Sequence, residues 1–503
     1  MKILSATQIR NADQYTIAHE PISSIDLMER AAGKCVEWIV EKIDKKKRIR
    51  IVCGLGNNGG DGLAIARLLH KKGYNIHLVI IRYSDKTSDD FKINEERIRK
   101  IKKLRIHDAH SISDIPSFED TDVIIDAILG SGLAKPIDGL LYDVVQQINE
   151  SNAFVVSIDL PSGLFPENNT NNNVKGIVQA YVTLTFQVPK LSFLLPQNYL
   201  YVGEWVLLDI GLNKEYLNSL DSSFYFMELN DIQQILKPRS KFAHKGNFGH
   251  ALLISGSYGK IGAAILASKA CLRSGAGLLT THVPQCGYDI IQKTVPEAMC
   301  SVDDEKEFIA KLPDISKYNA IAVGPGIGIN EQTQKIIKLL IQNAAIPLIL
   351  DADALNILSE NKTWLAFIPR YSILTPHPKE FERLAGKPKN DYERLQIQKE
   401  FSVKYSVYII YKGAYSTIST PTGKLYFNST GNPGMATGGS GDVLTGILLG
   451  LIASGYSSFD ASIIGTYIHG FAGDIAAHEK GETSLMAGDI VDFIPNAFNK
   501  IMV

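Results

Sequence analysis

The fold of the first half is decided by one stretch, Ile51-Val52-Cys53-Gly54-Leu55-Gly56-Asn57-Asn58-Gly59-Gly60-Asp61-Gly62, which leads into the helical pattern of residues 63–70. A β-branched apolar run, a glycine-rich turn and a helix follow one another, as at the phosphate-binding edge of a parallel sheet. A nicotinamide dehydrogenase of the usual kind has a ribose-binding acid about 20 residues further on, whereas the next strand ends in Arg82-Tyr83. The turn therefore predicts a phosphorylated ligand but disfavours such a dehydrogenase, and a turn that serves only packing is the alternative.

Strands and helices alternate outward from this turn in both halves. Continuous apolar runs of this kind are typical of parallel strands buried on both faces. In the first half they are Ile49–Cys53, Ile76–Ile81, Val123–Ala127 and Phe154–Ile158, and in the second half residues 249–256, Ala320–Val323, Pro347–Leu350, Ile373–Leu374 and Val407–Tyr411. We therefore expect an α/β protein with two parallel sheets.

The helices and the domain boundary follow from the residues between these runs. Asp13–Ile43 predicts a helix that breaks near Pro21, and Asn94–Leu104 predicts a charged surface helix. The pattern lapses in the polar segment Leu212–Arg239. We therefore predict one domain over residues 1–220 and a second over residues 225–503.

Two more strand ends of the first half carry carboxylates. Asp126 precedes Gly130-Ser131-Gly132, and Asp159 precedes Leu160-Pro161-Ser162-Gly163. Because the carboxyl ends of parallel strands share one edge, both should converge on Asn57-Asn58. Oxygen donors of this kind suit a hard cation, although each Asp alone would serve equally well as a helix cap.

These motifs, with Leu27-Met28-Glu29-Arg30-Ala31-Ala32-Gly33, resemble those of the NAD(P)H-hydrate epimerases over about residues 1–215. The resemblance implies potassium bound by Asn58, Asp126 and Ser162. It implies hydrated NAD(P)H bound by Asn57, Asn58, Gly59, Gly60, Asp61, Gly130, Ser131, Gly132, Leu133, Ala134, Lys135, Pro136 and Asp159. Inversion at a hemiaminal carbon needs proton transfers, for which we assign Asp159 first and Lys190 second, since a lone Lys after a Pro is more often a solvated loop residue.

The second half has its most specific stretch at Ser429–Asp442, which is rich in small residues and leads into the helix Val443–Ala453. Free N–H groups at such a helix start bind a phosphoryl group, and Asp442 is placed to accept the proton of a substrate hydroxyl. A helix cap is the alternative role of Asp442. The chain has no G-x-x-x-x-G-K-[ST] loop, which excludes a P-loop NTPase.

Residues 225–503 resemble the ribokinase-like fold and, more closely, the ADP- or ATP-dependent NAD(P)H-hydrate dehydratases. The resemblance rests on His244-Lys245-Gly246, Gly256-Ser257, Gly262-Ala263, Gly324-Pro325-Gly326, Thr375-Pro376-His377-Pro378, Lys412-Gly413 and residues 432–442. It implies that Ala263, Gly326, His377 and Asp442 contact hydrated NAD(P)H. It implies that the nucleotide is bound by Lys412, Gly413, Ala414, Tyr415, Ser416 and Gly441. Lys379 stands where Gly is usual, which affects only the local turn.

Composition excludes several other classes of protein. Lys plus Arg number 52 against 53 for Asp plus Glu, so no overall charge attracts nucleic acid or an anionic membrane. We expect a cytoplasmic protein because the amino terminus lacks the apolar run of a signal peptide. The five cysteines, Cys35, Cys53, Cys271, Cys286 and Cys300, lack the paired spacing of a zinc or redox site.

We therefore predict a bifunctional repair enzyme, with a Rossmann-like three-layer epimerase domain and a ribokinase-like α/β dehydratase domain. The expected cofactors are potassium and magnesium, with ADP or ATP as co-substrate, and the expected partners are small molecules and further copies of this chain. A vitamin or sugar kinase fused to a non-catalytic nucleotide-binding module is the alternative. The choice between ADP and ATP stays open at this point.

Overall fold

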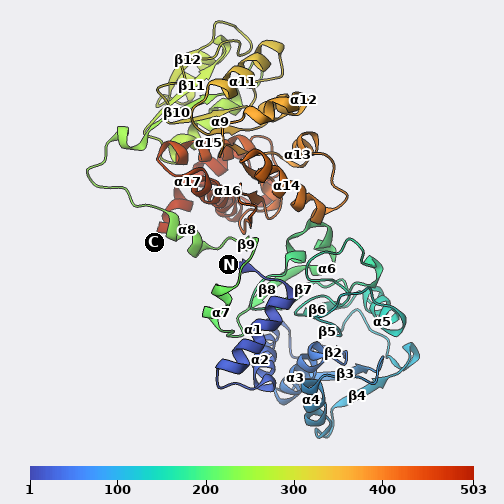
Figure 1. Cartoon of the computed structure of the whole chain (residues 1–503). Coiled ribbons are helices and arrows are strands. Elements are labelled where there is room, and N and C mark those ends of the chain that lie inside the picture. The colour runs from blue at the N-terminus through green and yellow to red at the C-terminus, as the bar shows by residue number, and fades with distance from the viewer. Residues whose placement is uncertain (503) are drawn as a thin grey trace. The chain divides into compact units, whose positions relative to one another are not determined.

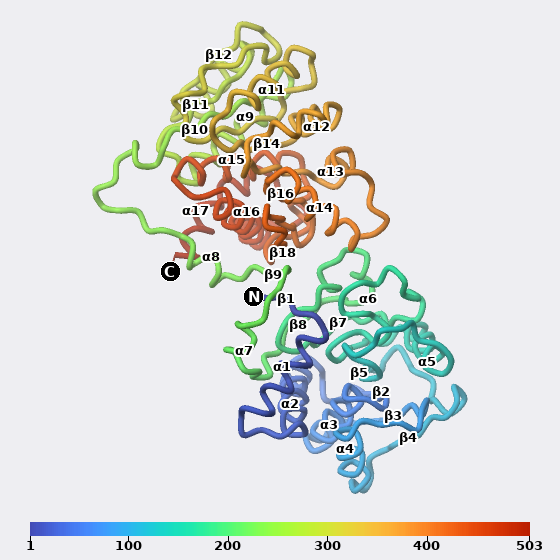
Figure 2. The backbone as a smooth tube through the Cα atoms, viewed as in Figure 1, coloured from blue at the N-terminus to red at the C-terminus, as the bar shows by residue number. Residues whose placement is uncertain are grey.

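The computed structural model describes residues 1–502 and divides the chain into two compact units. The first unit consists of Lys2–Ser222 with Asn390–Tyr392, and the second consists of Met1, Ser223–Lys389 and the residues from Glu393 onward. Figure 2 traces the first unit in blue to green and the second mainly in green to red. Each unit contains its own core clusters.

The first unit is built on a parallel sheet of order β4-β3-β2-β5-β6-β7-β8 (Figure 1). The strands are β2 (Arg48–Cys53), β3 (Asn75–Ile81), β4 (Arg105–Ala109), β5 (Val123–Ala127), β6 (Phe154–Ile158), β7 (Val182–Phe186) and β8 (Glu204–Leu208). The helices are α1 (Ala6–His19), α2 (Ser24–Lys42), α3 (Asn57–Lys71), α4 (Asp89–Arg99), α5 (Gly139–Glu150), α6 (Tyr199–Val202) and α7 (Lys214–Ser219).

Helices cover both faces of this sheet. Apolar residues of α2, α3 and α4 pack on one face, as Ile39, Leu63 and Phe91 show. On the other face, Val144 and Ile148 of α5 pack against the strands. The predicted Rossmann-like three-layer α/β architecture is confirmed, and so are the four predicted strands and the break between α1 and α2.

The predicted helix Asn94–Leu104 is wrong in its bounds. Ser88 caps α4 by accepting a hydrogen bond from the N–H of Phe91, so the helix begins earlier. It ends at Arg99, and Lys103 adopts a left-handed φ of 82° before β4 begins. The charge pattern of this segment does not signal that stop, because lysine rarely takes this conformation.

The sheet of the second unit has the order β9-β18-β17-β16-β15-β14-β13-β10-β11-β12. The strands are β9 (Phe224–Phe226), β10 (His250–Ile254), β11 (Leu278–Val283), β12 (Met299–Val302), β13 (Ala320–Val323), β14 (Leu348–Leu350), β15 (Ile373–Leu374), β16 (Tyr408–Tyr411), β17 (Thr417–Ser419) and β18 (Leu425–Phe427). The helices are α8 (Leu229–Ile235), α9 (Ile261–Arg273), α10 (Tyr288–Thr294), α11 (Glu331–Asn343), α12 (Asp353–Glu360), α13 (Pro378–Ala385), α14 (Asp391–Tyr405), α15 (Ser440–Ala453), α16 (Ser458–Lys480) and α17 (Ala487–Met502).

The central strands from β12 to β16 are parallel, as predicted, but β16, β17 and β18 pair antiparallel. The polar segment Leu212–Arg239, in which the strand and helix pattern lapses, contains three short elements, α7, β9 and α8. These elements have 6, 3 and 7 residues, too few for a hydrophobic period to show.

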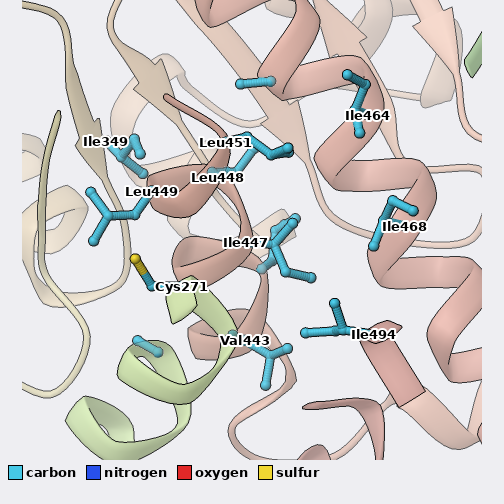
Figure 3. Close-up of a cluster of buried hydrophobic side chains, with 14 of the residues drawn as sticks. Cys271, Ile349, Val443, Ile447, Leu448, Leu449, Leu451, Ile464, Ile468 and Ile494 are labelled. Atoms are coloured by element: carbon cyan, nitrogen blue, oxygen red, sulfur yellow. The ribbon is translucent and has the colours of Figure 1, made fainter. Parts of the chain in front are cut away.

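The core of the second unit positions the start of α15. Figure 3 shows Val443 and Ile447 of α15 beside Ile464 of α16 and Ile494 of α17, and Cys271 of α9 lies in the same cluster. α15 also crosses α9 closely, since a Cβ atom at Gly446 would lie 2.2 Å from the carbonyl oxygen of Ala267. This packing fixes the helix whose first turn holds Asp442.

Two further findings concern membrane-spanning helices and the cysteines. Within residues 1–502, no helix combines the length and the apolarity that a membrane crossing needs. All five cysteines are free thiols; Cys35, Cys53 and Cys271 are buried, and Cys286 and Cys300 are half-buried.

Candidate functional sites

The first site lies at the carboxyl edge of the first sheet, where Asp126 at the end of β5 is fully buried. Its carboxylate accepts hydrogen bonds from the Ser162 hydroxyl at 2.5 Å, the Ser162 N–H at 2.9 Å and the Ser157 hydroxyl at 2.7 Å. Burial raises the pKa of Asp126, although these bonds oppose the shift. The structure thus brings Asp126 and Ser162 together.

Asn58 contributes unsatisfied polar atoms to the same edge. Its side chain is buried, and neither its amide oxygen nor its amide nitrogen has a hydrogen-bond partner among residues 1–502. The loop after β5 lies against it, since a Cβ atom at Gly130 would be 3.3 Å from the Asn58 Cβ and 3.6 Å from Asp159 Oδ2. A buried amide oxygen without a partner and a buried carboxylate fit a hard monovalent cation.

Asp159, after β6, is held by an ion pair. Lys190 Nζ lies 2.8 Å from Asp159 Oδ1 and also donates to the Thr185 hydroxyl at 2.9 Å. Lys190 is only 1% exposed, so the expectation of a solvated loop lysine is wrong. Asp159 takes a left-handed φ of 64°, a strained conformation for a residue with a side chain.

Asp13 of α1 is a site residue that the sequence analysis missed. Burial raises its pKa to about 7, and Asp159 adds to the shift, whereas Lys190 and Arg10 oppose it. Burial, Asp159 and Asp13 likewise raise the pKa of Asp61. No motif marks Asp13, because its position depends on where α1 packs against the sheet.

The other residues expected to bind substrate here fall into two groups. A Cβ atom at Gly59 would lie 2.1 Å from the Gly54 carbonyl oxygen, and one at Gly60 would lie 2.8 Å from Met28 Sδ. These two glycines therefore also permit close packing, the alternative considered above. By contrast, the residues Asn57, Gly132, Ala134, Lys135 and Pro136 are exposed, and Ser131 and Leu133 are half-buried.

The second site lies at the start of α15. Lys412, after β16, donates to Asp351 Oδ1 at 2.9 Å, and the Thr445 hydroxyl donates to Asp351 Oδ2 at 2.7 Å. A Cβ atom at Gly441 would lie 3.2 Å from Lys412 Nζ, so the glycine leaves the ammonium group uncovered. Asp351 is 1% exposed and ties the loop after β14 to α15.

Asp442 is the third residue of α15 and is not its cap. The N-cap is Gly439, which has no side chain to do the capping. Burial raises the pKa of Asp442 to about 7, and Asp351 adds to the shift, whereas Lys412 opposes it. A carboxyl group that ionises near neutral pH is suited to act as a general base.

His377 borders this site as the N-cap of α13. Its Nδ1 accepts hydrogen bonds from the N–H groups of Lys379 and Glu380, and the Glu380 carboxylate accepts from the N–H of His377 at 2.8 Å. Burial, together with Lys412 and Arg383, lowers the pKa of His377, which favours the neutral ring. Glu380 Oε2 lies 4.0 Å from Lys412 Nζ, which links His377 to the Asp351 network.

Of the remaining predicted substrate contacts, Ala263 lies in the first turn of α9 and Gly326 in the loop after β13. Gly326 takes a φ of 65°, and a Cβ atom there would lie 3.2 Å from the Cβ of Ala263. Asp353 accepts a hydrogen bond from the N–H of Gly328 at 2.9 Å. Ala352, between the two aspartates of this loop, has a strained φ of 49°.

The predicted nucleotide segment Lys412–Ser416 forms a turn after β16. The Ser416 hydroxyl donates to the Gly413 carbonyl at 2.9 Å, and Gly413 and Ala414 are exposed. Tyr415 takes a φ of 49°. The bond between Lys412 and Asp351 could not be predicted from the sequence, because the two residues are 61 positions apart.

Comparisons with known proteins cover both units. A family model described as the YjeF-related protein N-terminus matches residues 24–192, and one described as NAD(P)H-hydrate dehydratase matches residues 251–496. Among the curated proteins that match along nearly the whole chain are two that are both called bifunctional NAD(P)H-hydrate repair enzyme Nnr. The one from Moorella thermoacetica is 33% identical over 98% of this chain and 96% of its own. The one from Thermofilum pendens is 32% identical over 100% of this chain and 97% of its own.

A solved structure matches the second unit. A ribokinase-like superfamily protein from Enterococcus faecalis is 27% identical, with a TM-score of 0.50, over 56% of this chain and 98% of its own. The predicted ribokinase-like fold of the second half is thereby confirmed.

Proposed function

The chain belongs to the family of bifunctional NAD(P)H-hydrate repair enzymes, and from this premise we propose that its two units each carry one reaction. Residues 1–220 interconvert the R and S forms of hydrated NADH and NADPH. Residues 225–503 dehydrate the S form, with ADP or ATP as phosphoryl donor. One metabolite serves both reactions, which accounts for the fusion.

The observation that carries the dehydratase proposal is the carboxylate of Asp442 in the first turn of α15. The N–H groups at the start of α15 and the Lys412 ammonium bind the phosphoryl group during its transfer from the nucleotide to the substrate. Asp442 accepts the proton of the substrate's ring hydroxyl. The hydroxyl oxygen then bonds to the terminal phosphorus of the nucleotide, the bond from that phosphorus to its bridging oxygen breaks, and the nucleotide leaves with one phosphoryl group fewer. Loss of phosphate, with departure of a ring proton, restores the dihydronicotinamide.

The networks around Asp442 supply the remaining parts of the site. The resemblance supports binding of the nucleotide by Lys412–Ser416 and Gly441, and of hydrated NAD(P)H by Ala263, Gly326 and His377. Lys412 is positioned by Asp351, which supports a phosphate-binding role. Magnesium bound to the nucleotide phosphates would offset their negative charge beside Lys412.

The epimerase proposal rests on the Asp159–Lys190 ion pair. Inversion at the hemiaminal carbon requires removal of the hydroxyl proton, ring opening, and reclosure on the other face. Asp159 and Lys190 together present a proton acceptor and a proton donor 2.8 Å apart. Asp159 takes the hydroxyl proton, and Lys190 stabilises the carboxylate between transfers.

Potassium is proposed for the oxygens of Asn58, Asp126 and Ser162. The unpartnered amide oxygen of Asn58 and the buried carboxylate of Asp126 support this assignment. The ion supplies positive charge beside the substrate-binding loop Gly130–Pro136. The Ser162 hydroxyl oxygen would offer a lone pair to the ion while its hydrogen stays bonded to Asp126.

Separate assays of the two reactions test the proposal. The purified S form of hydrated NADH should regain the absorbance of NADH with ATP or ADP, and should not without nucleotide. The R form should regain it only as fast as it epimerises. Recovery that needs no nucleotide would contradict the dehydratase assignment, and an R form that never reacts would contradict the epimerase assignment.

A further inference from the structure

The face of the first sheet that packs against α5 changes character along β2, β3 and β4. Near the carboxyl ends of these strands it is apolar and buried, at Val52, Val79 and Ala109. Two residues earlier on each strand, and therefore on the same face, stand the basic side chains Arg50, His77 and His107. The face is thus a core surface at one end and a cationic surface at the other.

The basic side chains form an ordered row. Arg50 pairs in register with His77, and His77 with Arg105, so the three lie side by side across three adjacent strands. With Arg48 and His107 they line an open surface depression of about 710 Å³, called here the arginine groove. Arg50 and Arg105 stand two strands apart, one on each side of His77, so the row concentrates positive charge on this face of the sheet.

Protein carboxylates compensate only part of the row. Asp122, with a side chain that is 0% exposed, accepts from both Arg48 and Arg50, and Glu119 lies 2.8 Å from Arg48. Within the described chain, residues 1–502, Arg105 has no carboxylate within ion-pair distance; its guanidinium lies 3.4 Å from His77 Nε2. The buried Asp122 holds Arg48 and Arg50 in place, and the positive charge of Arg105 is not compensated by a carboxylate of the described residues.

The positive charge of the row lowers the pKa of His77. Burial lowers its pKa, and Arg50, Arg105, Arg48 and His107 lower it further. A bound anion would reverse the effect of these neighbours and allow His77 to donate a hydrogen bond as well.

We propose that the arginine groove binds a small molecule that carries two or more linked phosphoryl groups. Guanidinium groups match phosphate oxygens in paired hydrogen bonds. Arg48, whose side chain is 27% exposed, and the exposed Arg105 are separated by two strand spacings, about 10 Å across the sheet, which is longer than one phosphate group. Pyrophosphate is the simplest ligand of this class.

The groove is separate from the epimerase site. Asn58 and Asp159 follow the carboxyl ends of β2 and β6, and Asp126 is the last residue but one of β5 and pairs with Val52, whereas Arg50 lies three residues before the end of β2. Three residues of strand span about 10 Å. The groove therefore adds a second anion site to the first unit and does not extend the proposed substrate site.

Arginine footprinting on the full chain tests the proposal. It measures the modification rate of each arginine, so protection of the groove is distinguished from ligand binding at the dehydratase site. The protein is modified with phenylglyoxal in three parallel reactions, which contain pyrophosphate, sulfate at equal ionic strength, or a short oligonucleotide. Peptide mass spectrometry then measures the modification of each arginine. Pyrophosphate should slow modification of Arg105 and Arg48 several-fold. The exposed Arg370 of the second unit is the internal control.

Matched variants locate the binding. Arg105→Gln should raise the pyrophosphate concentration that half-protects Arg48 about tenfold, the value of one charge-assisted hydrogen bond. Lys102→Gln removes the same charge from an exposed position nearby and should change it less than twofold. The proposal is overturned if the two variants behave alike, if sulfate protects equally well, if only the oligonucleotide protects, or if nothing does.

Discussion

Replacement of Asp442 by asparagine should disable dehydration and leave the rest of the protein intact. The amide keeps the size of the carboxylate but cannot take up a proton from the substrate hydroxyl. Loss of a general base costs about 10²–10⁴-fold in rate, so dehydration of the S form should slow at least about a hundredfold. Nucleotide binding should change little, because the Asp351–Lys412 ion pair remains.

The pH dependence gives a second expectation for the same variant. The pKa of Asp442 is raised to about 7, so the base becomes available as the pH rises through 7. Dehydration by the unchanged protein should therefore increase over that interval, and this increase should be absent in Asp442→Asn. The measurement is initial rate against pH at saturating substrate and nucleotide.

Stability separates this result from misfolding. A carboxyl group with a raised folded-state pKa favours folding when protonated, and that contribution is lost as the pH rises from the unfolded pKa, about 4, to about 7. Above pH 7 the ionised Asp442 thus opposes folding, and asparagine removes the charge. Asp442→Asn should unfold at the same temperature as the unchanged protein or at a higher one.

A matched control lies on the next helix. Asp460 is the third residue of α16, as Asp442 is of α15, and it bonds to the Ser457 cap away from the site. Asp460→Asn should keep full dehydration, and both variants should keep epimerisation, which is followed by chromatography of the R and S forms. An Asp442→Asn protein that dehydrates within a few-fold of the unchanged protein would refute the general-base role.

Three further expectations concern other parts of the chain. Lys190→Met leaves the Asp159 carboxylate unpaired, so R-to-S exchange should fall at least about a hundredfold with dehydration of the S form unchanged; equal loss of both would point to unfolding. Asn58→Leu removes a proposed potassium ligand, so exchange should no longer respond when potassium is replaced by tetramethylammonium, whereas a persistent response would refute the assignment. Gly446→Ala places a methyl group against the backbone of α9 and should lower the free energy of unfolding by about 1–3 kcal/mol in urea titrations, whereas Gly488→Ala, with open space around it, should not.

The sequence predicts those parts of the fold and of the sites that depend only on which residues follow one another in the chain. Asp126 and Asp159 follow apolar runs, and the shared edge of a parallel sheet brings such positions together wherever the strands lie. Asp442 likewise follows glycines at a helix start. Short elements such as β9 and β17, with three residues each, carry too little pattern to be recognised.

The partners of these residues were not predictable, because they depend on tertiary packing. Lys190 is 31 positions from Asp159, and its burial follows from the way the loop after β7 folds back over the sheet edge. Asp13 precedes the first strand of the sheet and reaches the site only through the packing of α1. No spacing rule links such positions.

Each site contains a lysine, buried Lys190 in the first and half-buried Lys412 in the second, and the two lysines act differently because their nearest carboxylates differ. In the first unit Lys190 contacts Asp159 directly, so the residue proposed to transfer protons is also the partner of the ammonium group. In the second unit Lys412 pairs with Asp351 instead of Asp442. Burial and Asp351 therefore raise the pKa of Asp442 more than Lys412 lowers it. Direct pairing with Lys412 would make Asp442 a weaker base, and a phosphate-binding lysine held by a second aspartate keeps the base effective near neutral pH.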